Sequence, residues 1–249
     1  MDYYFTKDFA GPAFELFHTP HLLALSVVFS FILFIVFLKK YKNLRLNNAF
    51  RISLGMLLIV QEIIYHIWNI YIGEWTLQKM LPFHLCTVFV WLGAFMLLTK
   101  NRFIYDFAFF LGISGALQAL LTPDIAEYSF PHYRFFHVFI SHGSIVLAAL
   151  YMTIVENYRP TWRSFRKVFL WLNVYVVVIY FINLVVGSNY MYVVHKPETA
   201  SLLDVLGPWP VYIFASELVA LAMFIVLYLP FALYDWRQAW VLKKLTATT

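Results

Sequence analysis

Seven long apolar stretches dominate the chain, and short polar segments separate them. They cover residues 20–38, 52–72, 80–98, 103–121, 135–155, 168–187 and 211–233. A helix needs about 20 mainly apolar residues to cross the hydrocarbon core of a bilayer. The stretches are continuous rather than alternating, which argues against the strands of a membrane β-barrel. We therefore predict an all-α fold, a polytopic membrane helical bundle of seven transmembrane helices that forms a single domain over residues 1–249.

The positions of the basic residues predict how this bundle is oriented. Of the 18 Lys and Arg residues, 14 lie after the first, third, fifth and seventh stretches. Cytoplasmic segments of membrane proteins carry an excess of these residues. We therefore expect the N-terminus outside and the C-terminus inside. The same distribution explains the net charge of +5, so we expect the lipid bilayer as partner and no nucleic acid.

Composition narrows the class of protein further. The chain is 62% hydrophobic and 12% charged, whereas soluble domains contain roughly 25% charged residues. Charged residues occur before the first apolar stretch, so no cleavable signal peptide is predicted. The single cysteine, Cys86, excludes an intrachain disulfide and a zinc or iron–sulfur site built from several cysteines.

Polar residues inside the predicted spans are the main functional signal, because they are costly in a bilayer. They come from several spans, and nearly all lie in the outer half of the bundle. This distribution predicts a buried site open to the outer leaflet or to outside water, whereas a channel would continue polar residues to both sides. The candidate site residues are Glu62, His66, His84, Cys86, Gln118, Asp124, His132, Arg134, Ser141, His142, Asn183, Asn189 and Glu217.

Each of these residues also has a purely structural interpretation. A lone cysteine in a helix is usually a small packing residue, and a nucleophilic role would require an activating partner. His84, two positions from Cys86, would point to a different helix face, so His142 is the better candidate for the base. His66 and His142 could instead bond across helices, and Glu62 could be satisfied by His66 with Glu217 nearby.

Two further readings concern ligands. Glu62, His66, His142 and Glu217 could supply metal ligands, but no tight motif such as H-E-x-x-H occurs, so we expect no metal and no cofactor. Arg134 and Lys196 could bind lipid phosphate at the outer interface, or serve equally well as ordinary interfacial anchors.

Several segments together carry a family resemblance. They are LPFHLC (81–86), GALQALLTPD (115–124), FPHYRFFHVFISHG (130–143), GSNYMY (187–192) and KPETASLLDVLGPWP (196–210), followed by the span that contains Glu217. In order and spacing they resemble the YwaF-type bacterial membrane proteins and their eukaryotic relatives, the transmembrane protein 164 acyltransferases. The resemblance implies a multi-pass protein of the bacterial cell membrane that moves fatty acyl groups between phospholipids. It also implies Cys86 as the acyl-carrying residue and His142 as the catalytic histidine.

Two functions of different classes follow. The first is a thiol-dependent lipid acyltransferase or hydrolase acting on membrane phospholipid or fatty acyl substrates. His142 would take the proton of Cys86, and Gln118, Asn183 or Ser141 would stabilise the oxyanion. The alternative is a non-enzymatic protein that binds or transports small molecules or lipids, with Glu62 and Glu217 as proton or cation sites. A metal-dependent hydrolase is a third possibility.

Overall fold

The computed structural model describes residues 2–125, 127–197 and 202–247, and within these ranges it is helical, with no strand. Its principal helices are α1 (Thr19–Tyr41), α2 (Leu44–Tyr71), α3 (Leu77–Met80), α4 (Leu85–Thr99), α5 (Arg102–Phe107), α6 (Ile113–Leu121), α7 (Tyr133–Ile154), α8 (Trp162–Val186) and α9 (Val211–Ala247). A π-helical turn, η2 (Ala108–Gly112), joins α5 to α6 into one continuous element.

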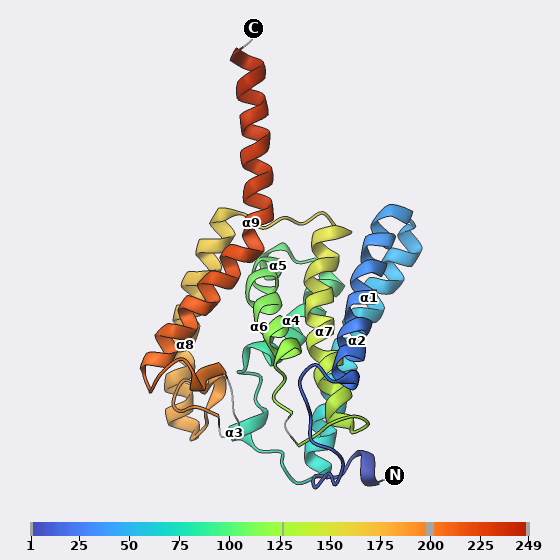
Figure 1. The fold of residues 1–249 in the computed structure, drawn as a ribbon, viewed down its shortest axis with the longest axis vertical. Helices are drawn as coiled ribbons and strands as arrows, with labels where there is room; N and C mark the ends of the chain where they lie inside the picture. Colours follow the sequence, from blue (N-terminus) through green and yellow to red (C-terminus); the bar gives the residue numbers. More distant parts are fainter. Residues whose placement is uncertain (1, 126, 198–201, 248–249) are drawn as a thin grey trace.

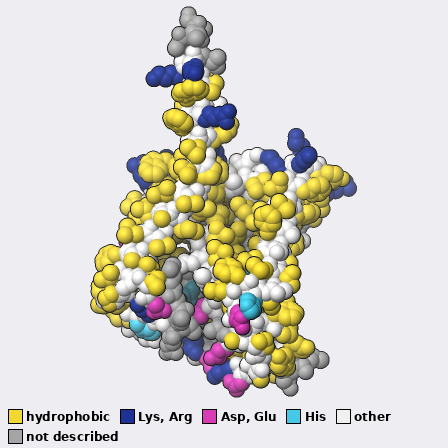
Figure 2. All heavy atoms as spheres, viewed as in Figure 1, with side chains coloured by type: hydrophobic (Ala, Val, Ile, Leu, Met, Phe, Trp, Pro, Cys, Tyr) yellow, Lys and Arg dark blue, Asp and Glu magenta, His cyan; other side chains and the backbone are white. Residues whose placement is uncertain are grey.

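The helices form a bundle in which α7 is central. It packs against α1, α2, α4 and α6, whereas α8 and α9 lie together on the opposite flank from α1 and α2 (Figure 1). Many apolar side chains of the outer helices face outward, among them Leu23, Leu170 and Leu218. The face seen in Figure 2 is largely apolar, as expected for contact with lipid.

Among the described residues, six elements are long and apolar enough to cross a membrane: α1, α2, the α5–η2–α6 unit, α7, α8 and α9. α4 is a shorter apolar helix of 15 residues within the same bundle. The prediction of an all-α polytopic membrane bundle is therefore confirmed.

The start of the third predicted span differs from the structure. Leu81 is extended (φ −68°, ψ 149°), because the residue before a proline avoids helical geometry, and Pro82 follows it. The short helix α3 therefore ends at Met80, and α4 begins only at Leu85 with His84 as its N-cap. At the other extreme, α9 continues well past residue 233 and projects from the bundle (Figure 1).

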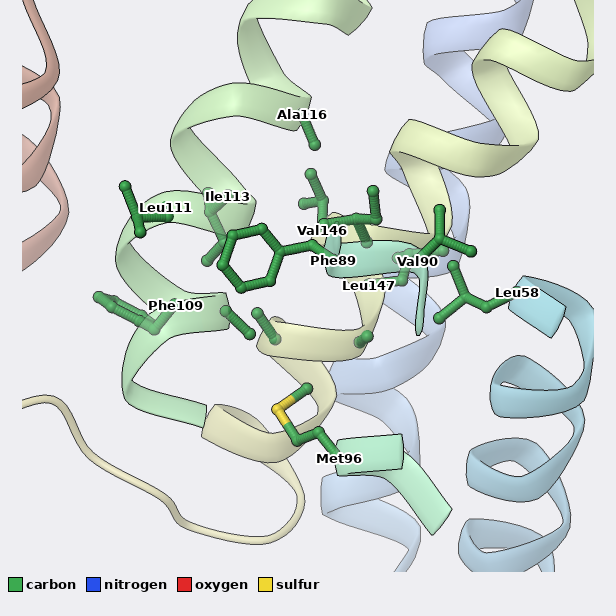
Figure 3. Close-up of a cluster of buried hydrophobic side chains, with 14 of the residues drawn as sticks. Leu58, Phe89, Val90, Met96, Phe109, Leu111, Ile113, Ala116, Val146 and Leu147 are labelled. Atoms are coloured by element: carbon green, nitrogen blue, oxygen red, sulfur yellow. The ribbon is translucent and has the colours of Figure 1, made fainter. Parts of the chain in front are cut away.

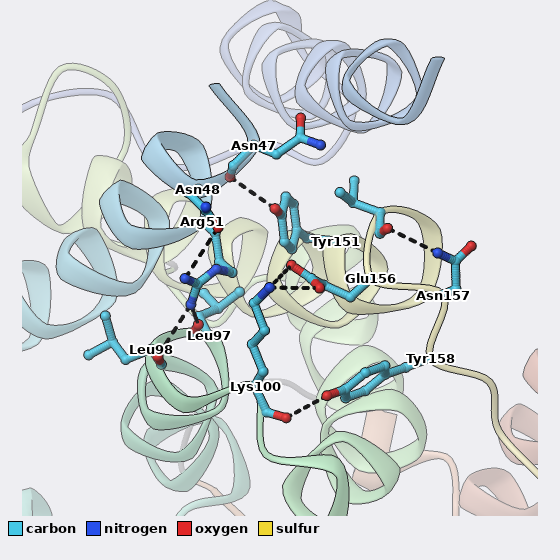
Figure 4. A network of polar contacts seen from close by, with 11 residues as sticks. Asn47, Asn48, Arg51, Leu97, Leu98, Lys100, Tyr151, Glu156, Asn157 and Tyr158 are labelled. Atoms are coloured by element: carbon cyan, nitrogen blue, oxygen red, sulfur yellow. Dashed lines mark hydrogen bonds and ion pairs between the residues drawn. The ribbon is translucent and has the colours of Figure 1, made fainter. Parts of the chain in front are cut away.

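The two ends of the bundle are built differently. At the end where α2, α5 and α8 begin, which we call the basic end, side chains close a polar network (Figure 4). Lys100 pairs with Glu156 at 2.8 Å, Tyr158 donates to the Lys100 carbonyl at 2.6 Å, and the Arg51 guanidinium binds the Leu97 carbonyl.

The opposite end, which we call the N-terminal end, is covered by residues 2–18. Three side chains hold this segment by its backbone carbonyls: Trp68 donates to Phe5 at 2.9 Å, Tyr128 to Lys7 at 2.9 Å, and His132 to Thr6 at 3.0 Å. The first residues of the chain therefore form part of the bundle's cover at this end.

A glycine allows three helices to meet closely in the core. A Cβ atom on Gly112 would lie 3.3 Å from Ile145 of α7 and 3.5 Å from Phe89 of α4. Phe89 fills the space between α6 and Val146 (Figure 3). This close, apolar contact fixes the relative depth of α4, α6 and α7 in the bundle.

Candidate functional site

A cavity of about 790 Å³ opens toward the N-terminal end, between α4, α6, α8 and α9. Its inner wall is apolar, with side chains such as Leu111, Leu172 and Phe224. Polar side chains gather nearer the mouth, where α4 and α9 begin and α6 ends. They are His84, Cys86, Gln118, Thr122, Asp124, Tyr192, Tyr212, Ser216 and Glu217, whereas Ser114 lies deeper, at the start of α6.

Cys86 lies in the first turn of α4 and faces this cavity. A Cβ atom added to Gly115 of α6 would lie 3.7 Å from the sulfur atom of Cys86. The thiol therefore lies beside a residue that has no side chain. Within the described ranges no group hydrogen-bonds to the sulfur. The thiol is therefore a cavity-facing group rather than a member of a closed polar network.

His142 reaches the same depth of the bundle from α7. Gly112 of α6 lies close to Phe89 of α4 and Ile145 of α7. One helical turn nearer the N-terminal end, each of these helices presents another residue, namely Gly115 on α6, Cys86 on α4 and His142 on α7. The 3.7 Å from an added Gly115 Cβ to the Cys86 sulfur places these two residues side by side, and the helix repeat brings His142 to that level. His142 itself is not part of the cavity wall.

The hydrogen bond of His142 defines which ring nitrogen carries the proton. Nδ1 lies 2.8 Å from the carbonyl oxygen of Val138, one turn back on α7. A carbonyl only accepts, so Nδ1 must donate, and Nε2 of the neutral ring keeps its lone pair. The ring is thus held in the tautomer that can accept a proton at Nε2.

His84 also lines the cavity, although its spacing from Cys86 predicted a different face. The helical rule does not apply because His84 is the N-cap, with extended geometry (φ −71°, ψ 141°). Its Nδ1 accepts the backbone N–H of Met191 at 3.2 Å, so in the neutral ring the proton is on Nε2. His84 is therefore a hydrogen-bond donor toward the cavity rather than a base.

Several predicted residues form a second group between α2 and α7. Glu62 lies 3.7 Å from His66, and Arg134 donates to His137 at 2.7 Å while its guanidinium lies over the Tyr65 ring. Glu62, His66 and Arg134 do not line the cavity, whereas Glu217 does. The single outer cluster expected from the sequence is thus divided, with Glu217 on the cavity side.

Tyr192 links the two groups. It lines the cavity, and its pKa is raised by burial and by the nearby Asp124 carboxylate, whereas the charge of Arg134 acts in the opposite direction. Tyr192 therefore lies within electrostatic reach of both Asp124 in the cavity wall and Arg134 in the second group.

Four other predicted residues have local structural partners or lie away from the cavity wall. Asn183 donates to the Tyr190 carbonyl at 2.9 Å and accepts from Ser188 and the Tyr190 N–H, which organises the loop after α8. Asn189 holds the same loop through the His195 carbonyl. His132 caps α7, and Ser141 is buried on that helix outside the cavity wall.

Sequence reasoning missed several parts of the cavity. Ser114 lies one turn before Gln118, so the i, i+4 spacing on an otherwise apolar helix was the available signal. Phe14 and Leu16 also line the cavity, but they belong to the N-terminal segment, whose fold depends on distant partners. In the part of the chain that the structure describes, no three His, Cys, Asp or Glu side chains are grouped to hold a metal ion.

Comparison with known proteins identifies the family. No curated protein and no solved structure matches this chain. The model of the TMEM164 family, by contrast, matches residues 14–228, which include α1 to α8, the first half of α9 and every residue discussed around the cavity. This protein therefore belongs to the TMEM164 family of membrane proteins.

Proposed function

We propose that this protein is a lipid acyltransferase or lipid hydrolase that uses Cys86 as nucleophile and His142 as general base. Two observations support the proposal. The Cys86 thiol faces the cavity and has no hydrogen-bond partner among the described residues. The His142 imidazole lies at the same depth, and the bond from its Nδ1 to the Val138 carbonyl leaves Nε2 unprotonated. A nucleophile combined with an oriented base from a neighbouring helix is a recurring arrangement of covalent catalysis, and the shared depth of Cys86 and His142 is compatible with it. Membership of the TMEM164 family agrees with a lipid-related role in the membrane.

The reaction that follows balances at each step. Nε2 of His142 takes the thiol proton as the sulfur of Cys86 attacks the acyl ester carbonyl. The carbon–oxygen bond to the lipid backbone breaks, and His142 returns the proton to the departing oxygen, which leaves a thioester on Cys86. A lysolipid hydroxyl then accepts the acyl group, or water does, and the proton passes through His142 back to the sulfur.

The shape of the cavity supports a lipid substrate. A volume of about 790 Å³ falls in the range of small-molecule sites, and the wall changes from polar at the mouth to apolar in depth. A lipid has the same order, because its headgroup and ester linkages are polar and its chains are not. We propose membrane phospholipid or its acyl chains as substrate.

We further propose that the N-terminal end faces the extracytoplasmic side, in a bacterial cell membrane. The support is the concentration of Lys and Arg at the basic end, which the positive-inside rule assigns to the cytoplasm. The active site would then draw its substrates from the outer leaflet.

A carrier of small molecules is the alternative, and the packing below the cavity argues against it. Gly112, Phe89 and Ile145 are in close apolar contact one turn below Cys86. A transport path needs polar groups or water through the whole bundle. Substrate flux into vesicles that persists in Cys86→Ala and fails in Glu62→Gln would favour the carrier.

The direct test is acylation of the purified protein in vesicles that contain phospholipid with a radiolabelled acyl chain. We expect label on wild-type protein that hydroxylamine removes, and none on Cys86→Ser. His142→Ala should reduce labelling by a factor of roughly 10² to 10⁴, since that is the usual contribution of a general base. His18→Ala, an exposed histidine paired with Glu15, is the matched control. Full labelling of both site variants would overturn the mechanism.

A further inference from the structure

The hydroxyl of Ser114 is a buried polar group without a partner. Its oxygen makes no hydrogen bond within the described residues. Some helical serines of this protein donate to the carbonyl four residues back, as Ser26, Ser30 and Ser216 do at 2.7, 2.8 and 2.7 Å. Ser114 makes no such bond, and a buried hydroxyl left unpaired costs roughly 1–3 kcal/mol.

A π-helical turn directly precedes Ser114. The carbonyl four residues back from Ser114 belongs to Phe110, inside η2 (Ala108–Gly112). Both this carbonyl and that of Ala108 receive the backbone N–H of Ile113, because the turn changes the hydrogen-bond register. Ser114 therefore lies where the helical register changes. Single π-helical turns of this kind occur frequently at functional sites.

The unpaired hydroxyl of Ser114 lies at the wall of the cavity. Ser114 and Gln118, one turn apart on α6, both line the cavity. Gly115 lies between them in the sequence, and a Cβ atom added to it would be 3.7 Å from the Cys86 sulfur. The Gln118 side chain has no hydrogen bond within the described residues. Two polar side chains with uncommitted donors therefore flank the part of α6 that touches the nucleophile.

We propose that the Ser114 hydroxyl and the Gln118 side-chain amide form the oxyanion hole of this site. The inference rests on the proposed thiol chemistry. When the sulfur attacks the ester, the carbonyl oxygen becomes negatively charged, and both groups donate hydrogen bonds to it. Neither gives up its proton, and the charge returns to the carbonyl when the tetrahedral intermediate collapses to the thioester. Rotation about the Cα–Cβ bond of Ser114 breaks no hydrogen bond, so the hydroxyl can turn toward the cavity when the ester arrives.

This role differs measurably from a packing role. A serine that only packs would be replaced by alanine with little loss, because alanine is the better helix former and the unpaired hydroxyl disappears. An oxyanion donor would instead leave stability unchanged or improved while the chemical step slows. Removing one such donor typically lowers kcat by a factor of about 10² to 10³.

The test measures the rate of hydroxylamine-sensitive acylation in the full chain, in vesicles with radiolabelled phospholipid at varied content. We expect Ser114→Ala to lower the maximal rate by a factor of about 10² to 10³ with little change in the half-saturating lipid content, and Gln118→Ala to have a similar effect. Ser114→Thr, which keeps a hydroxyl, should recover most of the rate. Ser144→Ala, at a buried helical serine outside the cavity, is the control.

The outcomes separate the two proposals. Wild-type acylation combined with a Ser114→Ala rate within about threefold of it overturns the oxyanion hole and leaves the thiol mechanism standing. Failure of Ser114→Thr to recover the rate, with its melting temperature unchanged, also overturns it. Absence of acylation in the wild-type protein overturns both.

Discussion

Both ends of the bundle contain paired polar side chains, but they differ in what lies beside the unpaired ones. At the basic end Lys100 binds Glu156, Lys167 binds Asp106 at 2.6 Å, and Arg159 binds Asp235 at 2.6 Å, within a closed network. Toward the N-terminal end the thiol of Cys86 and the hydroxyl of Ser114 have no hydrogen-bond partner among the described residues, and both line a cavity. A polar group without a partner can act on a ligand where a cavity lies beside it, so the cavity distinguishes the two ends.

The comparison predicts that mutations at the two ends have separable effects. Changes near the cavity should alter activity more than stability, and changes at the basic end should do the reverse. Enzymes commonly show this division, because the polar groups of a ligand site are arranged to bind the ligand and not to stabilise the fold.

The largest effect is expected from Gly115→Leu. The new side chain would enter the space beside the Cys86 sulfur, so acylation should fall at least about 100-fold through loss of the attack geometry. Gly115→Ala should retain much of the activity, because its Cβ makes an ordinary contact at 3.7 Å. Radiolabel incorporation measures both, and normal labelling of the leucine variant would contradict the placement of the site.

A smaller effect, on stability alone, is expected from Asp106→Asn at the basic end. The change leaves Lys167 without its carboxylate partner in a largely buried position, and should cost about 1–3 kcal/mol. Thermal unfolding of the two proteins in detergent measures this loss of stability. The double variant with Lys167→Met should recover part of it, and acylation per folded molecule should stay near wild type. Loss of activity without loss of stability would break the comparison.

Tyr151→Phe tests a single neutral hydrogen bond at the same end. The phenol donates to the Asn47 carbonyl at 2.9 Å and joins α7 to the start of α2 (Figure 4). Its removal should lower stability by about 1 kcal/mol, which corresponds to a fall in melting temperature of roughly 2–4 °C. Equal melting temperatures for the two proteins would show that this contact contributes nothing.

The smallest effect is a pH dependence at the N-terminal end. His132 accepts the Arg134 N–H at Nδ1 and donates to Thr6 from Nε2, and burial lowers its pKa below 6.5. Because the folded pKa is the lower one, the stabilisation is complete above pH 6.5 and is lost as pH falls through the folded value. The melting temperature of wild type should therefore drop by roughly 1–3 °C more than that of His132→Asn on acidification from pH 7. If the melting temperatures of the two proteins fall equally with pH, His132 is not the source of the pH dependence.

Span positions followed from the sequence because the bilayer imposes a local rule on every crossing segment. The resemblance also directed attention to Cys86 and His142, which the helix contacts bring to one level. The register of η2 was not predictable, since a π-helical turn depends on tertiary packing around Phe110 rather than on local preference. The helical i, i+2 rule did not apply to His84, because this residue is the N-cap of α4, and Pro82 was the signal against a helix there.

Asn183 illustrates the opposite error. A polar amide at the end of a span looked available for chemistry, yet it is occupied by the turn that follows α8. Only the path of that turn, which reverses direction through Gly187 at φ 68°, shows that the amide is a loop-closing group. Local sequence identifies a polar group but does not tell whether the chain returns to bind it.

The cover formed by residues 2–18 has a consequence for biosynthesis. This segment is synthesised before its anchors Trp68, Tyr128 and His132, and α9, which contributes a wall of the cavity, follows all of them along the chain. The cavity beside the Cys86 thiol therefore has all its walls only after α9 has been inserted. A chain stalled before α9 would hold this cysteine without the enclosing helix, so the order of synthesis delays the formation of the cavity.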